Sequence, residues 1–351
     1  MTSMSNPEPS RTTPTARATM RDVAALAGVG IKTVSRVING EPNVSDALTA
    51  KVRLATEQLN YQPDLHAGNL KRSDRKTRTI GLVVGSVANP FSGLVHRGVE
   101  DVAADRGVAV FASSLDDDPS RETRIVSEML SRRVDALILT TVKQNQGYLI
   151  PEQQRGTVIV FVDRQPAGID ADSVVTNNAE AAAAATAHLI EHGHRSIAYL
   201  GDRVDLWTAR ERRRGYFEQL AAVGIPTSEA IAVDGLHDDQ TSYEATMRLF
   251  SSGSAPTAIF TAQNLVTIGA VRALRQLGLQ RKVAIVGFDD IPLGDLLEPA
   301  ITVVSQQPYA IGRLAATRAF DRIDGIDSDF GLHVLPSVLV PRGSGEIRPA
   351  L

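Results

Sequence analysis

One short stretch of the sequence carries side chains of the kinds that can reach the edges of DNA bases. Small polar and basic residues, with one isoleucine, follow one edge of a predicted helix: Ile31, Lys32, Thr33, Ser35, Arg36 and Asn39. A helix that enters the DNA major groove needs such an edge, where hydrogen-bonding groups can meet the bases. The alternative is the solvated polar face of a small helical domain.

Three short helices must position this edge. Thr19 followed by Asp22 is a capping-box pattern ahead of apolar residues at helical spacing. Residues 28–30 form a glycine turn, and Val34 and Val37 of the next helix face inward. A capping serine and apolar residues at three- and four-residue spacing predict a third helix: Ser45, Leu48, Val52, Ala55 and Leu59. The pattern is typical of a helix-turn-helix unit.

The charge of the 351 residues is unevenly distributed along the chain. Residues 1–78 hold 12 of the 37 basic and 7 of the 40 acidic residues, a net charge of +5, which leaves −8 for the remainder. A basic segment in front of an acidic body is typical of an attached nucleic-acid-binding module. The charge distribution therefore favours DNA binding over a merely solvated helix face.

The composition excludes several other classes of protein. The absence of cysteine rules out disulfides, thiolate metal sites and a cysteine nucleophile. The longest apolar runs are shorter than the roughly 18 residues of a membrane span, and the first 18 residues contain no apolar signal-peptide core. We therefore expect a cytoplasmic protein with no membrane partner.

Beyond residue 79, short apolar runs alternate with amphipathic, helix-like segments. The same rhythm occurs twice, in residues 80–84, 108–112, 136–139 and 158–162, and again in residues 197–200, 231–233, 258–260 and 283–286. Continuous hydrophobicity indicates strands buried on both faces of a parallel sheet. The repeated rhythm predicts two doubly wound α/β lobes.

Two patterns could instead point to catalysis. His188, Glu191 and His192 match the H-x-x-E-H pattern of some zinc peptidases, but they lie at the predicted end of a helix, where histidines favour the helix dipole. Asp289 and Asp290 are adjacent carboxylates, which point apart at the end of a strand. No nucleotide-binding glycine motif occurs. We expect no enzyme activity, no cofactor and no metal.

Most of the chain after residue 18 resembles the LacI/GalR family of bacterial transcriptional regulators. The resemblance is carried by Thr19–Asn39, Asn43–Ser45, Leu59–Pro63, Ile80–Val84, Asn89–Phe91, Ser131–Asp135, Val162–Arg164, Thr208–Arg212, Val286–Asp290 and Gly312–Ala315. It implies an all-α helix-turn-helix headpiece followed by a periplasmic-binding-protein-like α/β core of two doubly wound parallel-sheet lobes.

The resemblance assigns roles to the headpiece residues. In the family, the two positions before the Thr33–Val37 run read operator bases, and here they are Ile31 and Lys32. Lys32 can donate to guanine, whereas Ile31 can touch only a thymine methyl group or exclude water. The other implied DNA contacts are Thr19, Thr33, Ser35, Arg36, Asn39, Asn43 and Tyr61.

The segment after Pro63 resembles the hinge helix of the family, which folds on operator DNA and inserts a leucine into the minor groove. Leu70 would be this wedge, followed by basic residues for phosphates. A helix this short is unstable in isolation, which agrees with folding on DNA. Gly68 replaces the Arg or Gln usual in relatives and weakens the helix by about 0.5 to 1 kcal/mol.

The resemblance also implies a small-molecule site between the lobes. Sugars are recognised by carboxylate, amide and guanidinium groups that bridge hydroxyls, and by an aromatic face. The implied effector contacts are Phe91, Asp163, Arg164, Trp207, Arg210, His237, Gln263, Asn264, Asp289 and Gln306. Gln263 and Asn264 replace a usual Asn-Asp pair, and His237 stands where an aromatic residue is frequent. Trp207 either stacks on the effector or packs between the lobes, and Arg164 either binds it or forms a surface ion pair.

The sequence thus predicts a homodimeric, effector-controlled repressor of operator double-stranded DNA, with a sugar, sugar phosphate, polyol or nucleobase as effector. The alternative is a soluble sugar-binding protein or hydrolase with an added DNA-binding head. The expected parts are a disordered tail (1–18), the headpiece (19–63), a hinge helix and basic linker (64–78) and an effector-binding and dimerisation domain (79–351), with lobe 1 at 79–175 and 306–335 and lobe 2 at 176–305 and 336–351.

Overall fold

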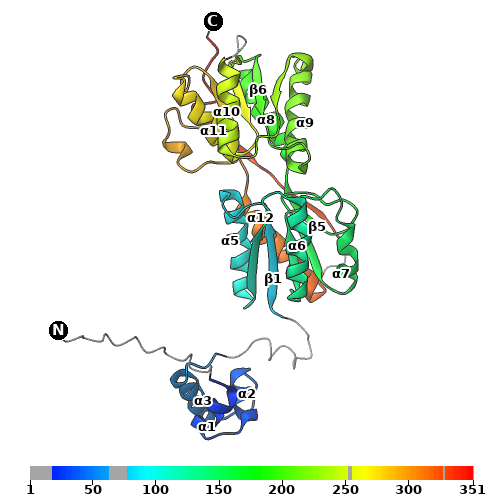
Figure 1. Cartoon of the computed structure of the whole chain (residues 1–351), viewed down its shortest axis with the longest axis vertical. Coiled ribbons are helices and arrows are strands. Elements are labelled where there is room, and N and C mark those ends of the chain that lie inside the picture. The colour runs from blue at the N-terminus through cyan, green and yellow to red at the C-terminus, as the bar shows by residue number, and fades with distance from the viewer. Residues whose placement is uncertain (1–17, 63–76, 252–254, 327–328, 351) are drawn as a thin grey trace, which may run out of the picture. The chain divides into compact units, whose positions relative to one another are not determined.

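The computed structural model describes residues 18–62, 77–251, 255–326 and 329–350. The chain divides into two compact units, residues 1–77 and residues 78–351 (Figure 1). The predicted tail up to residue 17 and most of the predicted hinge, with Gly68 and Leu70, lie outside the described residues. In the part of the chain that is described, none of the helices is long and apolar enough to cross a membrane.

The first unit consists of three short helices, α1 (Met20–Ala27), α2 (Ile31–Ile38) and α3 (Asp46–Gln58). The predicted capping box is present: the Asp22 amide donates to Thr19 Oγ1 (3.4 Å) and the Thr19 amide donates to Asp22 Oδ2 (2.7 Å). Gly28, at φ 66°, ends α1 in the left-handed conformation and opens the turn into α2. Ser45 occupies the N-cap of α3, but its side chain makes no capping hydrogen bond.

A small apolar core joins these helices. Its buried members are Val23, Ala24, Val34, Val52, Ala55 and Tyr61. Val34 faces inward as predicted, and Val37 packs partly buried against the same core. Because α2 is anchored through these valines, its polar edge is left facing outward.

The second unit contains two six-stranded sheets. Lobe 1 has the order β11-β5-β4-β3-β1-β2, made of β1 (Thr79–Val84), β2 (Ala109–Ser114), β3 (Ala136–Leu139), β4 (Val158–Val162), β5 (Asp172–Thr176) and β11 (Leu332–Leu335). Lobe 2 has the order β12-β10-β9-β8-β6-β7, made of β6 (Ile197–Leu200), β7 (Ile231–Val233), β8 (Ala258–Thr261), β9 (Ala284–Phe288), β10 (Thr302–Ser305) and β12 (Val338–Val340). The predicted pair of doubly wound lobes is confirmed.

Strand β2 departs from the predicted burial. It lies at the edge of its sheet, and Phe111 is 45% exposed there. An apolar run alone does not distinguish a central strand from an edge strand, whose outer side has no neighbouring strand.

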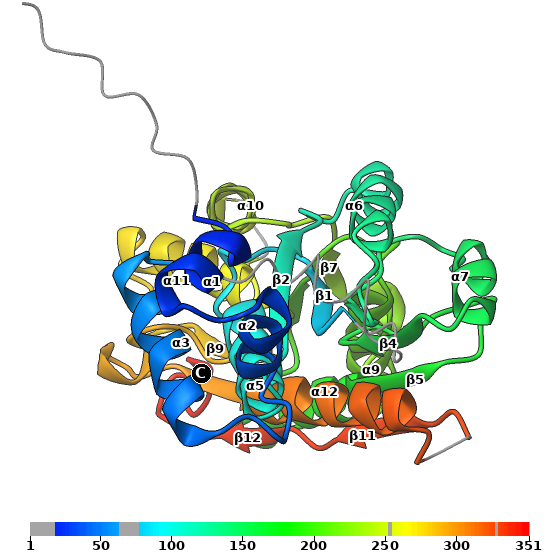
Figure 2. The same cartoon turned by 90° about the horizontal axis from the view of Figure 1, so that it is seen from below.

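Helices cover both faces of each sheet (Figures 1 and 2). In lobe 1, α5 (Pro90–Asp105) and α12 (Pro308–Asp324) lie on one face, and α6 (Pro119–Ser131) and α7 (Ile150–Gln154) on the other. In lobe 2 the two pairs are α8 (Asn178–Glu191) with α9 (Trp207–Ala222), and α10 (Asp239–Ser251) with α11 (Asn264–Gln276). Short 3-10 turns occur at Gly147–Leu149, Thr227–Glu229 and Gly294–Leu296.

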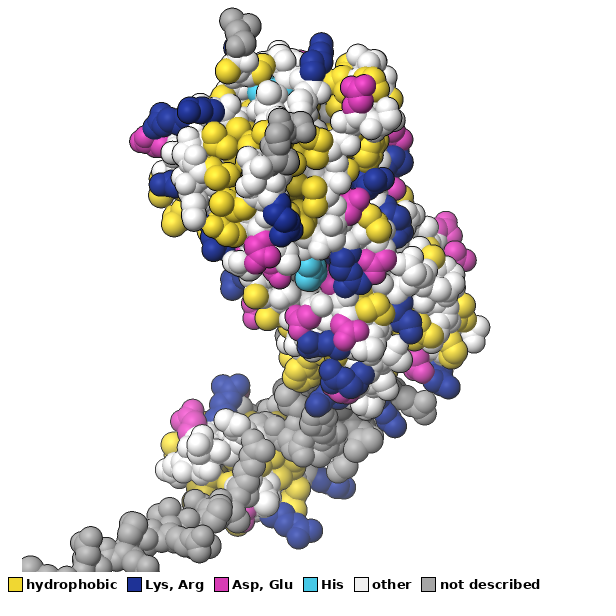
Figure 3. Space-filling view, turned by 45° about the horizontal axis from the view of Figure 1, so that its top comes forward, with side chains coloured by type: hydrophobic (Ala, Val, Ile, Leu, Met, Phe, Trp, Pro, Cys, Tyr) yellow, Lys and Arg dark blue, Asp and Glu magenta, His cyan; other side chains and the backbone are white. Residues whose placement is uncertain are grey.

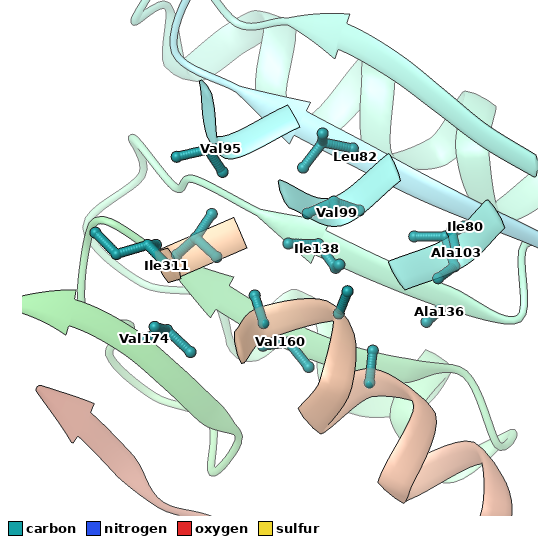
Figure 4. Close-up of a cluster of buried hydrophobic side chains, with 14 of the residues drawn as sticks. Ile80, Leu82, Val95, Val99, Ala103, Ala136, Ile138, Val160, Val174 and Ile311 are labelled. Carbon is teal, nitrogen blue, oxygen red and sulfur yellow. The ribbon is translucent and has the colours of Figure 1, made fainter. Parts of the chain in front are cut away.

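The core of lobe 1 explains why α5 and α12 pack so closely. Ile80, Ile138 and Val160 of the central strands meet Val99 and Ile311 of these helices (Figure 4). Behind them the two helix backbones nearly touch, and each carries a glycine at the contact: a Cβ on Gly98 or on Gly312 would lie 2.2 or 2.1 Å from a carbonyl oxygen of the other helix. Only glycine permits this approach.

The chain crosses between the lobes three times, at residues 176–178, 305–308 and 335–338. Asn177 Oδ1 accepts hydrogen bonds from the amide (2.9 Å) and the hydroxyl (2.8 Å) of Ser337. Gln307 Nε2 donates to the Pro336 carbonyl oxygen (2.7 Å). These bonds join the three crossing segments into one connection between the lobes.

Candidate functional site

Helix α2 presents most of the predicted DNA contacts to solvent. Ile31, Lys32, Arg36 and Asn39 are exposed, whereas Thr33 and Ser35 are half-buried. Asn39 Nδ2 donates to Ser35 Oγ (3.3 Å), and Arg36 Nε lies 3.8 Å from Glu41 Oε2. Such an exposed ion pair is weak, so Arg36 can exchange it for a phosphate or a base.

The other predicted headpiece contacts lie outside α2. Thr19 is exposed and its hydroxyl donates to Asp22 Oδ2 (2.7 Å). Asn43 is exposed in a left-handed conformation with φ 74°. Tyr61 is buried in the headpiece core, so its ring is part of the packing, and a DNA contact through its hydroxyl stays a prediction.

The two sheets bring one aspartate each to the boundary between the lobes. Asp163 follows β4 and Asp289 follows β9, and both adopt left-handed backbone conformations, φ 66° and 70°. These are the carboxyl ends of parallel strands, where doubly wound sheets bind ligands. Together with their charged and polar neighbours they form the interlobe cleft, defined here as Asp117, Asp163, Arg164, Asp202, Arg212, His237, Asp289 and Gln306. Figure 3 shows acidic and basic side chains gathered at the boundary between the lobes.

The electrostatics of the cleft combine burial with paired charges. Burial raises the pKa of the Asp163 carboxyl, and the guanidinium groups of Arg164 and Arg212 oppose this shift. Burial also raises the pKa of the Asp289 carboxyl, opposed by Arg212 and by the hydrogen bond from Gln306. The two buried carboxylates therefore favour donors that can take the place of water.

Lobe 1 holds Arg164 in this cleft. Its Nη1 donates to Asp117 Oδ1 (2.7 Å) and to the Thr141 carbonyl oxygen (3.2 Å). Its Nε lies 3.6 Å from Asp163 Oδ2 and has no hydrogen-bond partner among the described residues. Arg164 does form an ion pair, but the pair is buried rather than at the surface.

Lobe 2 contributes a comparable arrangement around Asp289. Gln306 Nε2 donates to Asp289 Oδ1 (2.6 Å), and the buried Gln306 Oε1 finds no partner in the described part of the chain. Arg212 Nη1 lies 3.9 Å from Asp289 Oδ2, and its Nε donates to Asn178 Oδ1 (2.7 Å). The guanidinium also stacks 3.8 Å from the ring centre of Phe288. A ligand that brings a donor can satisfy Gln306.

Arg212 is a cleft residue that the sequence analysis missed. Arg210, predicted in this region, is exposed and donates through Nη1 to the Asp205 carbonyl oxygen (2.9 Å). Arg212 lies on the buried stripe of α9 with Ala209 and Tyr216, at three- and four-residue spacing. A lone charge on an apolar helix face is the signal that could have found it.

Gln263 and Asn264 already have partners in the protein. Gln263 Oε1 accepts hydrogen bonds from two main-chain amides of the first turn of α11 (2.8 and 3.2 Å), and its Nε2 donates to Asp202 Oδ2 (3.3 Å). Asn264 Nδ2 donates across the lobe boundary to Asn89 Oδ1 (2.8 Å). Phe91 packs partly buried against the core of lobe 1. An effector contact by these residues stays a prediction.

Trp207 and Arg210 line a small cavity at the lobe boundary, where Arg164, Gln165 and Pro166 come from lobe 1. The side chain of Trp207 is partly buried. The indole thus packs at the lobe boundary, and its stacking on an effector stays a prediction.

His237 lies between carboxylates of both lobes. Its Nδ1 is 3.1 Å from Asp202 Oδ1 in lobe 2, and its Nε2 is 3.7 Å from Asp117 Oδ2 in lobe 1. The hydrogen bond that the imidazole donates to the Asp202 carboxylate is the main cause that raises the pKa of His237 above its ordinary value. His237 is therefore a polar contact between carboxylates of the two lobes.

The histidines of the H-x-x-E-H pattern have structural partners. His188 Nε2 contacts Glu346 Oε1 (2.6 Å) and His192 Nδ1 contacts the His188 carbonyl oxygen (2.8 Å). His194 Nε2 contacts the Ile347 carbonyl oxygen (2.7 Å). The bonds of His188 and His194 fasten the C-terminal segment to lobe 2, and no group of three metal-binding side chains occurs within the described residues.

Comparison with known proteins places both units. Residues 19–64 match the family of bacterial regulatory proteins, lacI family, and residues 186–345 match the periplasmic binding protein-like domain. The ribose operon repressor of Escherichia coli (strain K12) is 34% identical over 330 residues, which cover 93% of this chain and 99% of that protein.

Two solved structures extend the similarity. A structure of the lac repressor dimer bound to operator and the anti-inducer ONPF is 26% identical with a TM-score of 0.83, over 94% of this chain and 99% of that one. The transcriptional regulator CelR in complex with cellobiose is 30% identical with a TM-score of 0.66, over 93% of this chain and all of that one. From its headpiece to its second lobe, this chain belongs to the lacI family of bacterial regulatory proteins.

Proposed function

We propose that this chain is a transcriptional repressor whose affinity for operator DNA changes when a neutral, polyhydroxylated effector occupies the interlobe cleft. The observation that carries the proposal is that the buried Asp163 and Asp289 lie close enough to interact at the lobe boundary, where Gln306 Oε1 has no hydrogen-bond partner among the described residues. A ribose operon repressor and a cellobiose-bound regulator among the relatives support a sugar. No catalytic step and no cofactor is needed, and we place the protein in the cytoplasm.

The charges of the cleft favour a neutral sugar over a sugar phosphate. Four carboxylates line it: Asp117, Asp163, Asp202 and Asp289. The two buried guanidinium groups, Arg164 and Arg212, already face carboxylates. A phosphate would add negative charge next to these carboxylates. Hydroxyls can donate to the carboxylates and to Gln306 Oε1, and can accept from Arg164 Nε.

The DNA-binding part of the proposal rests on the exposed edge of α2. Ile31 and Lys32 would contact bases, and Arg36 bases or phosphates. Thr19, Thr33, Ser35, Asn39, Asn43 and Tyr61 would complete the contact, and Leu70, outside the described residues, would be the minor-groove wedge. We also propose the domain boundaries that the sequence predicts, with the headpiece at residues 19–63 and the hinge and linker at residues 64–78.

A single α2 covers only a half-site, so we propose a homodimer. Its surface would use large apolar side chains that are exposed in both lobes. In lobe 1 these are Leu94 of α5 and Phe111 of β2, and in lobe 2 they are Leu293 and Leu296 of the loop after β9. Side chains of this kind mark interaction surfaces when they gather on one face.

A thermal-shift screen of the full chain tests the effector. Neutral pentoses, hexoses and disaccharides are compared with their phosphates, because a ligand of the folded state must raise the melting temperature. The proposal expects a stabilising neutral sugar whose effect Asp289→Asn abolishes. Stabilisation by phosphorylated sugars alone would contradict it.

A DNA titration with and without that sugar tests whether the effector changes the affinity for operator DNA. The same titration of headpiece variants tests the predicted DNA contacts. Lys32→Ala is expected to relax base preference at one position by about 1 to 3 kcal/mol. Arg36→Ala is expected to weaken binding to every duplex and to lower the salt dependence. Unchanged operator selectivity after Lys32→Ala would remove this residue from base reading.

A further inference from the structure

Three residues join the two lobes at one side of the cleft. Asp117 belongs to lobe 1, in the loop between β2 and α6, and its Oδ2 lies 3.7 Å from His237 Nε2 of lobe 2. The carbonyl oxygen of Asp117 accepts a hydrogen bond from Arg203 Nη1 of lobe 2 (2.8 Å). We call Asp117, Arg203 and His237 the latch. It joins the lobes through protein groups alone, with no effector involved.

Each latch residue of lobe 2 is held in place by a neighbour of its own lobe. Asp202 Oδ1 contacts His237 Nδ1 (3.1 Å), which leaves Nε2 directed towards Asp117. Asp205 accepts hydrogen bonds from Nε (3.0 Å) and Nη2 (2.5 Å) of Arg203, which leaves Nη1 for the other lobe. The latch residues of lobe 2 are therefore positioned within their own lobe, and their contacts to Asp117 reach the other lobe.

We infer that the latch stabilises the arrangement of the lobes described here, which we call closed, against an open arrangement in which the latch contacts to Asp117 are broken. Protonation of His237 strengthens the latch, so that acidification favours closure in the absence of any effector. The charged groups that face His237 are Asp117, Asp202, Arg203 and Asp238. Only Asp117 belongs to the other lobe, so only its interaction is lost when the cleft opens. This inference goes beyond the proposed function and does not depend on the identity of the sugar.

The direction of the effect follows from linkage. The carboxylate of Asp117 favours the imidazolium, whereas burial of the ring opposes it. Because Asp117 faces His237 only when the lobes are together, we expect the pKa of His237 to be higher in the closed than in the open arrangement. The preference for closure is complete below the open-state pKa and is lost as the pH rises through the closed-state pKa. Because His237 is partly exposed, the change in the closure equilibrium is about two- to fivefold.

Histidine ring NMR of the full chain measures the first consequence. The chain has seven histidines, and the His237 resonance is assigned by its loss in His237→Gln. Asp117→Asn is expected to lower the pKa of His237, while it keeps the carbonyl oxygen that Arg203 uses. The matched control is Asp116→Asn, since Asp116 is the exposed neighbour that pairs with Arg121 of its own lobe. An equal His237 pKa in wild type and Asp117→Asn overturns the inference.

Small-angle X-ray scattering of the ligand-free protein measures closure itself. Wild type is expected to become more compact as the pH falls through the titration of His237, and His237→Gln is expected to lack this step. The fluorescence of Trp207, the only tryptophan and a residue of the lobe boundary, gives a second readout of the same transition. The same pH response in wild type and His237→Gln would contradict the inference, whatever the outcome of the sugar screen.

Discussion

The two lobes have the same strand order, and each places one aspartate at the cleft. They differ in where the arginine that faces this aspartate comes from. In lobe 1, Asp163 faces Arg164, the next residue in the chain, which Asp117 also binds. In lobe 2, Asp289 faces Arg212, which arrives from α9. The same strand-end position can thus obtain its partner from the adjacent sequence or from tertiary packing.

The lobes also differ in their last strand. Strand β11 runs parallel to β5, whereas β12 runs antiparallel to β10. Only residues 336–337 separate β11 from β12, so the chain continues almost directly from one lobe into the other. Because β10 runs towards the lobe boundary and β12 away from it, the second sheet closes with an antiparallel strand.

Removal of the buried cations should have the largest effect. Arg212→Met leaves Asp289 buried without its guanidinium, and Arg164→Met does the same to Asp117 and Asp163. Each substitution is expected to lower the free energy of unfolding by about 3 to 5 kcal/mol. Urea denaturation of both variants measures this. If Arg212→Met lowered the free energy of unfolding by less than about 1 kcal/mol while Arg164→Met lowered it by the expected amount, only lobe 1 would depend on its buried arginine for stability.

Two buried aspartates should respond to pH in opposite directions. Burial raises the pKa of the Asp172 carboxyl in lobe 1, but hydrogen bonds from Arg322 and the Gly331 amide outweigh it, so its pKa is lowered. Asp172→Asn is expected to lose about 1.5 to 3 kcal/mol of unfolding free energy at neutral pH. This loss should shrink as the pH falls through the lowered pKa.

For Asp289 the sign reverses, because its pKa is raised. Its protonated form is favoured by folding, so the stability of wild type relative to Asp289→Asn should be greatest at low pH and should fall as the pH rises through the raised pKa. Urea denaturation between pH 3 and pH 8 compares both variants with wild type. Parallel pH profiles for the two aspartates would remove this contrast between the lobes.

The close helix pairs of the two lobes can be compared through their glycines. A Cβ on Gly312 of α12 would lie 2.1 Å from the Val95 carbonyl oxygen, and one on Gly215 of α9 would lie 2.0 Å from the Ala179 carbonyl oxygen. Gly312→Ala and Gly215→Ala are each expected to lower the melting temperature through a loss of about 1 to 3 kcal/mol.

Gly93 of α5 provides the control, since a Cβ there meets nothing within 4 Å. Gly93→Ala is expected to raise stability by about 0.5 to 1 kcal/mol, because alanine is the better helix former. If Gly93→Ala destabilised the protein as much as Gly312→Ala, the loss of stability at Gly312 could not be attributed to the close contact between the two helices.

Arg210→Ala should have the smallest effect on stability. Its side chain is exposed and its hydrogen bond goes to a main-chain oxygen near the surface. The free energy of unfolding is expected to stay within about 0.5 kcal/mol of wild type. The measurement is the same denaturation series as for Arg212→Met, and equal losses at both arginines would contradict the distinction between them.

Local patterns predicted the elements and part of the site. The Thr19 and Asp22 capping box was visible because it depends on residues three apart. Asp163 and Asp289 were expected at the effector site from the resemblance to the LacI/GalR family, and both lie at the lobe boundary. The exposure of Phe111 could not be predicted, since edge and central strands have the same local sequence pattern. The absence of a capping hydrogen bond from the Ser45 side chain could not be predicted either, because serine is a residue type that favours such a bond.

The sequence by itself thus determined the headpiece, the two-lobed α/β core, the family and the polar edge of α2, because each depends on periodicity or on motifs of short range. Only the tertiary structure decided which charges meet: Arg212 with Asp289, Gln306 with Asp289, and His237 with both Asp202 and Asp117. These pairs join segments far apart in the chain. Of the pairs named, His237 with Asp117 joins the two lobes, and the others depend on how strands and helices pack at the lobe boundary, which no local pattern encodes.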